Sequence, residues 1–567
     1  MRYGKWFIGL ISAAFVLVAV VFGKSEYSWD GTVEVRAQIG FQGQTEEIRS
    51  WEKDRDDVYL FLPGSVDPED VRLYAQAPGV EIFLNGEPLT EGSTGTGLVP
   101  DVEYDLCYLY RDKEHHYGLT FRQSAQIPTL YVDTASGTMT HIHKKKGNEE
   151  TGTLRLYDEA GTLEYSGELD AIKGRGNSTW EQEKKPYNLT LKEEADLLDM
   201  GQAARWILLA NASDATNMRN KLAYDLARDA GLAYTPECKW VDLYLNGEYA
   251  GLYLLSERNE VHEERVAIGG EDTFLVAKDW RWRFEENGDP FILTEDKAAL
   301  RVYHSDFSLE ALRDIFQRAE NAILAEDGID PVTGSHWRDL IDVDSWAKKY
   351  LVEEVLGNTD ASTLSQFFYY DGSGKIFAGP VWDMDLTLKA KEQDWREGKD
   401  LLYGVKDGVY GSGWIRSLYD QEEFYDRVTQ LYAQDFLPLL ENLRDGGVEE
   451  YWQEIAQAAR MNEYRWLNGE PEKATEQLLT ALTQRIDFLN RIWVQKEPHV
   501  IVTVTEYGGA KTSFAHTPGE TLQSLPVYKN DENTIYYGWH HHDNGMLFDP
   551  SQPVWEDIYI EIWSETR

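Results

Sequence analysis

The pattern of apolar and polar positions divides the chain into two strand-rich ends and a middle with helical periodicity. Apolar and polar residues alternate through residues 27–120, for example at 58–62 and 80–84, and Pro63-Gly64 and Asn85-Gly86 supply turns. From 307 to 490 the apolar residues instead recur at helical spacing, as at Leu309, Leu312, Phe316 and Ala319. The pattern predicts a small all-β domain followed by a mixed region that becomes mostly helical.

A short β-hairpin with an aspartate at each open end is predicted near the centre of the chain. Aromatic residues 366–370 have strand character, residues 371–374 are turn formers, and residues 375–378 form a second strand. Asp360 and Asp383 lie at matching distances from the turn. Because an antiparallel pair brings its open ends together, we expect these two carboxylates to face one cleft.

The segments around this hairpin follow the order found in protein kinases. Asp344 opens an amphipathic helix that Gly357 ends, so that Asp360 falls in the loop after the helix. A loop aspartate, a hairpin and a second acidic motif are the order in which kinase-like folds present a catalytic base and a metal-binding carboxylate. The alternative is ordinary solvated charge, because the chain has 99 Asp and Glu residues.

Several longer motifs resemble the spore coat protein H (CotH) kinase family over residues 125–497. They occupy residues 170–180, 184–189, 206–211, 214, 218–220, 243–257 and 381–385. The resemblance implies an α+β fold with an atypical, bilobal protein-kinase-like domain. It also implies an activity of the secretory pathway, in which ATP and Mg²⁺ or Mn²⁺ are used to phosphorylate serine on other proteins.

The resemblance also implies roles for the acidic side chains. Asp360 corresponds to the catalytic aspartate and Asp383 to the metal-binding one. Asp385 is a candidate second oxygen ligand, although an outward-facing strand carboxylate is equally expected there. Ordinary kinases carry a metal-binding amide after the catalytic aspartate, and here it would fall near Gln366.

The candidates for nucleotide binding are mostly basic. The resemblance favours Lys184 or Lys185 as the phosphate-binding lysine without choosing between them, and two solvated edge lysines are the alternative. Glu257 follows an apolar strand and is the expected partner of that lysine. Arg175 lies between two glycines, where its guanidinium can reach phosphate oxygens, although a tight turn explains the glycines equally well.

Departures from the kinase pattern keep two other functions open. Asn358-Thr359 stand where ordinary kinases have His-Arg, and Leu386 stands where relatives tend to carry glycine. A weakly active or inactive surface protein that binds partners or acts as a scaffold is therefore one alternative. A metal-dependent hydrolase, which uses similar carboxylates, is the other.

The first residues predict export. Residues 1–5 contain two basic side chains, and residues 6–22 contain only apolar, glycine and serine members. Residues 1–24 are therefore interpreted as a signal peptide or an uncleaved transmembrane anchor, with the rest of the chain secreted or on the extracellular face of a Gram-positive type of cell envelope. The expected partners are the membrane and protein substrates at the cell surface.

The charge of the chain excludes one class of partner. A formal net charge of −44 and a pI near 4.6 argue against binding to nucleic acid, and only Lys144 to Lys146 form a local basic run. Two cysteines, Cys107 and Cys238, cannot make a disulfide framework. Neither feature predicts an oligomeric state.

The C-terminal residues 498–567 return to strand patterns. Alternating segments at 500–504 and 558–563, separated by Gly508-Gly509 and Gly519, resemble one Listeria-internalin-type B repeat. That resemblance implies a compact β-grasp-like module of Gram-positive surface proteins, which serves as a spacer or a contact surface.

Overall fold

The computed structural model describes most of the chain. The described residues are 35–42, 44–53, 57–75, 80–89, 93–94, 98–389, 396, 399–405, 413–467 and 469–566. The predicted export segment at 1–24 lies outside them. Within the described residues, no helix has the length and apolar character needed to cross a membrane.

The chain forms two compact units, one of residues 1–123 with 247–249 and one of residues 124–246 with 250–567. The described part of the first unit consists of strands and one short 3-10 turn, η1 (Pro68–Asp70). The strands expected at 58–62 and 80–84 are present as β4 and β6. Its strands are β1 (Val35–Phe41), β2 (Gln44–Arg49), β3 (Trp51–Glu52), β4 (Asp57–Leu62), β5 (Arg72–Ala75), β6 (Glu81–Leu84), β7 (Glu87–Pro88), β8 (Ser93–Thr94), β9 (Glu103–Tyr110) and β10 (Lys113–Gln123).

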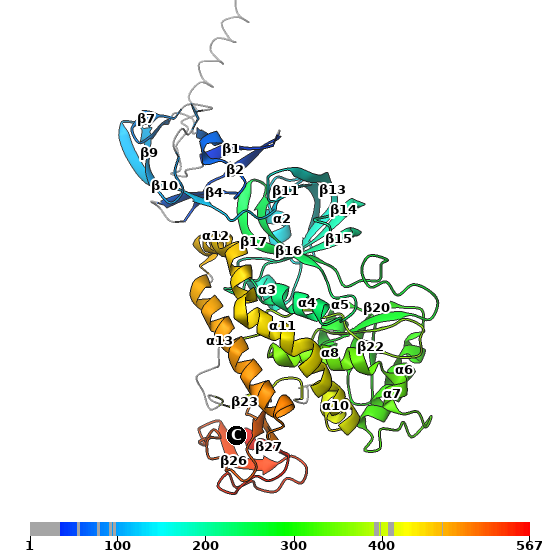
Figure 1. Ribbon diagram of the computed structural model, residues 1–567. Coiled ribbons are helices and arrows are strands. Elements are labelled where there is room, and N and C mark those ends of the chain that lie inside the picture. The colour runs from blue at the N-terminus through cyan, green and yellow to red at the C-terminus, as the bar shows by residue number, and fades with distance from the viewer. Residues whose placement is uncertain are drawn as a thin grey trace, which may run out of the picture. The chain divides into compact units, whose positions relative to one another are not determined.

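The second unit begins with seven strands whose sheet closes on itself (Figure 1). The order is β15-β14-β13-β12-β11-β16-β17, and β17 also pairs with β15. Alternate residues such as Leu154, Trp206 and Leu243 point inward and form a buried core. The strands are β11 (Thr129–Thr134), β12 (Glu149–Tyr157), β13 (Leu163–Gly174), β14 (Tyr187–Asp196), β15 (Gln202–Leu209), β16 (Cys238–Leu245) and β17 (Glu248–Glu257).

Short helices interrupt this sheet where the chain leaves it. Helix α2 (Thr140–Lys144) follows β11, α3 (Ser178–Glu181) follows β13, and α4 (Arg219–Asp229) follows β15. Ile142 and Trp180 anchor the first two helices in the core of the closed sheet.

A second sheet contains the predicted hairpin. Its order is β19-β20-β18-β21-β22, and the predicted hairpin is present, with Phe368 paired to Ala378 and Tyr369 to Phe377. The second strand covers only 377–378 of the expected 375–378. Both faces of β21 are largely buried, since aromatic residues fill it. The strands are β18 (Phe274–Lys278), β19 (Phe291–Leu293), β20 (Ala299–Ser305), β21 (Gln366–Tyr370) and β22 (Phe377–Ala378).

Helices cover this second sheet and continue toward the C-terminus. Helix α8 is capped by Asp342, whose Oδ1 accepts from Ser345 N at 2.8 Å, and Gly357 with φ 59° follows its end as expected. Their apolar faces meet in one large core that includes Trp337, Trp346 and Trp414. The helices are α5 (Arg281–Asn287), α6 (Leu309–Leu324), α7 (Trp337–Leu340), α8 (Val343–Val355), α9 (Trp414–Tyr419), α10 (Glu422–Leu431), α11 (Leu437–Asn442), α12 (Val448–Trp466) and α13 (Pro471–Leu489), with π-helical turns at Tyr432–Phe436, Leu443–Gly447 and Asn490–Val494.

The C-terminal residues form a sheet that includes one strand from the preceding region. Its order is β23-β25-β24-β27-β26, and β24 runs parallel to β27. Strand β23 comes shortly after the acidic motif at 383–385, so the C-terminal strands hold this part of the chain by backbone hydrogen bonds. The strands are β23 (Asp400–Leu402), β24 (Val500–Thr505), β25 (Lys511–His516), β26 (Thr534–His541) and β27 (Ile558–Thr566).

The expected mixture of helices and sheets is therefore present. The bilobal kinase-like layout and the internalin-type identity of the C-terminal strands stay predictions. Cys107 and Cys238 are both buried free thiols and lie in different units.

Candidate functional site

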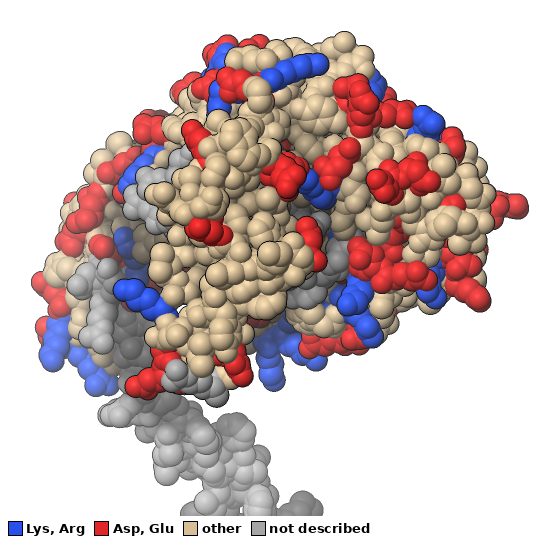
Figure 2. All heavy atoms as spheres, turned by 90° about the horizontal axis from the view of Figure 1, so that it is seen from below, with Lys and Arg blue, Asp and Glu red and all other residues tan. Residues whose placement is uncertain are grey.

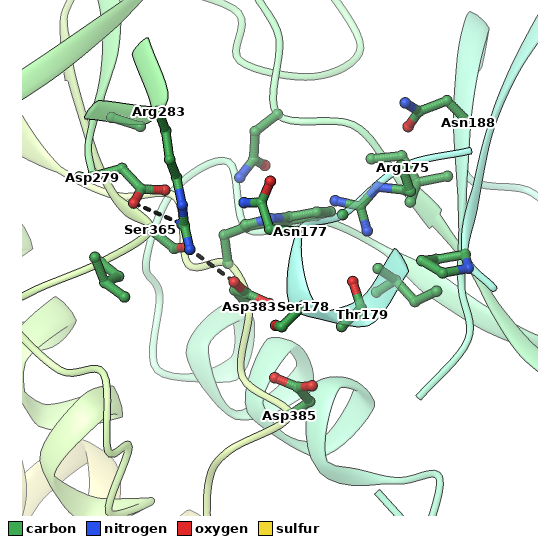
Figure 3. Close-up of a pocket in the computed structure, with 18 of the residues that line it drawn as sticks. Arg175, Asn177, Ser178, Thr179, Asn188, Asp279, Arg283, Ser365, Asp383 and Asp385 are labelled. Carbon is green, nitrogen blue, oxygen red and sulfur yellow. Dashed lines mark hydrogen bonds and ion pairs between the residues drawn. The ribbon is translucent and has the colours of Figure 1, made fainter. Parts of the chain in front are cut away.

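A cavity of about 440 Å³ in the second unit contains four of the predicted site residues. Arg175 lies on the loop after β13, Asp360 lies on the loop after α8, and Asp383 and Asp385 lie on the loop after the hairpin. Figure 3 shows the Arg175 side chain extending toward the centre of the cavity. The structure thus gathers residues that are up to 210 positions apart in the sequence.

The three aspartates form the acidic wall of the cavity. Asp383 is exposed and adopts a φ of 64°, and its Oδ2 accepts a hydrogen bond from the Ser365 hydroxyl at 3.0 Å. Burial, together with the neighbouring carboxylates of Asp383, Asp214 and Asp360, raises the pKa of Asp385 to about 7 against the opposing effect of Lys389. Negative charge is therefore concentrated here, and a bound cation would relieve the repulsion.

The acidic wall suits a cation that arrives with other ligands. Within the described residues, no group of three or more His, Cys, Asp or Glu side chains forms a ready-made metal site. Mg²⁺ in nucleotide sites is commonly held by one or two carboxylates, with phosphates and water completing the shell. Asp383 and Asp385 fit that smaller requirement.

Buried polar residues at the start of α4 hold the loop that carries Asp383 and Asp385. Met384 N donates to Asn220 Oδ1 at 2.8 Å, and Arg219 Nε donates to Thr387 O at 2.6 Å. Asp214, which is buried, forms an ion pair with Arg219 and accepts from its backbone N–H at 2.9 Å. No chemical role for these residues was predicted from the sequence, and the contacts identify them as positioning residues for the acidic loop.

A second buried network fixes the loop of Asp360. Asp360 N donates to Asn358 Oδ1 at 3.0 Å, and Asn358 Nδ2 donates to Glu353 Oε2 at 2.8 Å. Lys278 Nζ donates to Ser362 O at 2.6 Å from the adjacent sheet. The loop is therefore tied to both α8 and β18.

Gln366 belongs to this buried network and does not line the cavity. Its Oε1 accepts from Lys349 Nζ at 2.8 Å, and its Nε2 donates to Leu364 O at 2.7 Å. Ser365 lines the cavity in its place and bonds to Asp383. In the kinase motif the amide comes five residues after the catalytic aspartate, and that place is position 365 in this chain. The motif therefore predicts Ser365, and not Gln366, at this place.

The loop after β13 also lines the cavity. Gly176 has φ +82°, and a Cβ there would lie 2.0 Å from Thr179 Oγ1. A Cβ at Gly174 would lie 2.1 Å from the Trp180 ring. Both glycines are therefore required for this loop, which we call the glycine loop (174–179).

Arg175 presents its guanidinium from the glycine loop. The group lies 5.3 Å from the centre of the Trp382 ring. Burial lowers the pKa of Arg175, and Asp383 opposes that effect. Among the described residues no carboxylate forms an ion pair with it, so it is available to an anion.

Neither predicted lysine reaches the cavity. Lys184 is buried, with its Nζ donating to Leu252 O at 2.5 Å, and burial lowers its pKa to about 7. Lys185 Nζ donates to Trp180 O at 2.8 Å and to Gln182 O at 3.1 Å. Both ammonium groups therefore donate hydrogen bonds to backbone carbonyl oxygens.

Glu257 lies outside the cavity as well, and its partner is an arginine. Arg265 Nη1 donates to its Oε1 at 2.6 Å, and Glu237 N donates to its Oε2 at 2.8 Å. Burial raises the pKa of Glu257 to about 7 despite these bonds. The contacts of Glu257 thus differ from the lysine pairing that the sequence predicted.

The cavity also contains charged residues that the sequence interpretation did not select. Arg283 on α5 pairs with Asp279 at 2.9 Å, as Figure 3 shows. Arg301 pairs with Asp289 at 3.0 Å. Lys146 also lines the cavity, and its position at the end of the only basic run was a signal that could have identified it.

Comparison with known proteins identifies a family. A family model described as CotH kinase protein matches residues 172–490, which is more than half of the chain. The match contains Arg175 and all three aspartates, and it ends before β24. No curated protein matches the chain.

Proposed function

Because the chain belongs to the CotH kinase family, we propose that it transfers the γ-phosphoryl group of ATP to serine hydroxyls of other proteins. The observation that carries this proposal is the cavity itself, where three carboxylates face a glycine loop with an available arginine. Phosphoryl transfer requires this pairing of an acidic side with a phosphate-binding side.

The residues fit both the nucleotide and its metal ion. Asp383 and Asp385 would hold Mg²⁺ or Mn²⁺, and Arg175 with the backbone of the glycine loop would hold phosphate oxygens. The bound cation neutralises charge that develops on the phosphates during transfer.

Asp360 is the proposed catalytic residue. Its carboxylate orients the serine hydroxyl of the acceptor and takes the proton as the hydroxyl oxygen bonds to the γ-phosphorus. The bond from that phosphorus to the bridging oxygen breaks, and ADP leaves. The hydrogen bond from Asp360 N to Asn358 and the one from Lys278 to Ser362 O keep the Asp360 loop in place for this step.

Specific observations favour a second candidate, a weakly active or inactive binding protein. Lys184, Lys185 and Gln366 lie outside the cavity, and Asn358-Thr359 replace the usual His-Arg. For either candidate we propose an exported protein at the outer face of the cell envelope, on the basis of residues 1–24.

Phosphate incorporation from labelled ATP tests the proposal. The purified chain without residues 1–24 is incubated with Mn²⁺ or Mg²⁺ and with serine-rich acceptor proteins. We expect metal-dependent labelling that Asp383→Ala reduces by orders of magnitude, because that substitution removes a metal ligand. Asp371→Ala changes an exposed carboxylate in the turn of the same hairpin and is the matched control.

Two results would contradict the proposal. One is a wild type that labels neither itself nor any acceptor protein. The other is equal labelling by the wild type and Asp383→Ala.

A further inference from the structure

The basic side chains around the cavity differ in how their charge is used. Arg283 and Arg301 each form an ion pair with a neighbouring aspartate, and Arg258 lies 3.7 Å from Glu260. Lys146 and Arg175 have no ion pair with a carboxylate among the described residues. They are the lining cations whose charge remains for a ligand.

The cavity lies in a strongly acidic chain. The chain carries 99 acidic against 55 basic side chains, and Figure 2 shows acidic groups spread over the visible face with basic ones among them. A lysine that lines a polar cavity without a carboxylate partner, in such a chain, is suited to an anionic ligand.

Lys146 lies directly beside the glycine loop. It follows α2, is partly buried, and its Nζ donates to Gly176 O at 2.8 Å and to Asn177 Oδ1 at 3.3 Å. Since an ammonium group has three N–H donors, these two bonds leave one for a ligand. The bonds also fix the ammonium at the wall where Arg175 enters.

We propose that Lys146 is the phosphate-binding lysine of this site and contacts the phosphate chain of the nucleotide together with Arg175. The inference rests on the proposed function and deepens it. Lys146 precedes the first residue matched by the family model, which is residue 172, so the match assigns it no role. Phosphate binding, which was predicted for Lys184 or Lys185, is thus assigned to a lysine from a different segment.

A purely structural role gives a different expectation. If Lys146 only ties the glycine loop, its removal disturbs the loop for every ligand of the cavity. If it contacts phosphates, its removal weakens phosphate-bearing ligands alone. Ligands with and without phosphates therefore separate the two roles.

Calorimetry with three ligands in the presence of Mg²⁺ tests the proposal on the chain without residues 1–24. The ligands are ATP, tripolyphosphate and adenosine, and the proteins are the wild type, Lys146→Ala, Lys146→Arg and the control Lys145→Ala. Lys145 is the exposed neighbour in the same basic run and does not line the cavity. Melting temperatures check that each variant is folded.

We expect Lys146→Ala to weaken the binding of ATP and of tripolyphosphate about tenfold or more, because a charge-assisted hydrogen bond is lost. Adenosine binding should stay unchanged, Lys146→Arg should retain most of the phosphate affinity, and Lys145→Ala should match the wild type. Unchanged affinity of Lys146→Ala for both phosphate ligands overturns the inference. So does a parallel loss for adenosine, or a wild type that binds neither phosphate ligand.

The two proposals fail in distinguishable ways. If the wild type labels acceptors and Lys146→Ala binds ATP equally well, only the lysine inference is wrong. If Lys146 is needed for phosphate binding but no acceptor is labelled, only the kinase proposal is wrong.

Discussion

The acidic and basic walls of the cavity are built in different ways. Asp360, Asp383 and Asp385 come from one stretch of chain around a hairpin, and two buried networks hold their loops. Lys146 and Arg175 lie at the open end of another antiparallel pair, since β12 pairs with β13 and places Glu149 opposite Lys173. Both walls therefore stand at the open end of an antiparallel strand pair, but different contacts hold their loops. Buried side-chain networks hold the aspartate loops, whereas two glycines and the hydrogen bonds of Lys146 hold the basic wall.

The acidic wall should contain the residues whose loss costs most activity. Asp360→Asn is expected to lower kcat by roughly 10²-fold to 10⁴-fold, because the acceptor hydroxyl loses its base, while ATP affinity stays near that of the wild type. Steady-state kinetics and calorimetry measure the two quantities. A large loss of ATP affinity with little change in kcat would reverse the assignments of the two walls.

The pH dependence of the free energy of unfolding tests whether Lys184 is a buried structural lysine. Its pKa is about 7 in the folded state against 10.5 for an ordinary lysine, so the unfolded state binds more protons between these values. The free energy of unfolding should therefore rise with pH from about 7 to about 10.5, by an amount on the order of a few kcal/mol from this group.

Denaturant melts across that pH range measure this effect. Lys184→Met should flatten the rise, since it removes the buried ammonium group, whereas Lys146→Ala should leave it unchanged. The same slope in Lys184→Met and the wild type would show that Lys184 is not the group responsible.

The network at the start of α4 should affect the acidic wall at a distance. Asn220→Ala removes the acceptor of Met384 N, and an unsatisfied buried N–H costs about 1 to 3 kcal/mol. We expect a higher Mn²⁺ requirement for labelling, by about tenfold, with little change in the affinity for metal-free tripolyphosphate. Equal metal titration curves for the variant and the wild type would show that the loop does not need this bond.

The smallest effect is expected at Ser365. Ser365→Ala removes one hydrogen bond to Asp383, which is worth about 1 kcal/mol, so the metal requirement should rise only several-fold. Gln366→Ala should instead lower the melting temperature, because Gln366 bonds to buried Lys349. A stronger metal effect at Gln366 than at Ser365 would restore the interpretation made from the sequence.

The sequence was sufficient where a structure is set by neighbouring residues. The hairpin, the end of α8 and the placement of Asp360 and Asp383 in one cavity follow from short-range patterns, and the structure contains each of them. The predicted start of α8 at Asp344 was wrong, because Asp342 caps the helix. The chemical roles of these aspartates stay predictions.

The sequence was insufficient where side chains choose between partners. Strand alternation allows one of Lys184 and Lys185 to face a ligand, but Leu252 O and Trp180 O take both ammonium groups. Glu257 likewise binds Arg265, which no local pattern connects to it. The basic run at 144–146 was a signal for Lys146, but its contact with the glycine loop is visible only in the structure.

A crystal structure of the chain soaked with ATP and Mn²⁺, with anomalous scattering recorded for manganese, shows whether the cavity binds the nucleotide together with its metal ion. We expect a manganese peak between Asp383, Asp385 and the nucleotide phosphates, with Lys146 and Arg175 on the opposite side of the phosphate chain. A nucleotide bound away from this cavity, or manganese held without contact to Asp383 and Asp385, would contradict it.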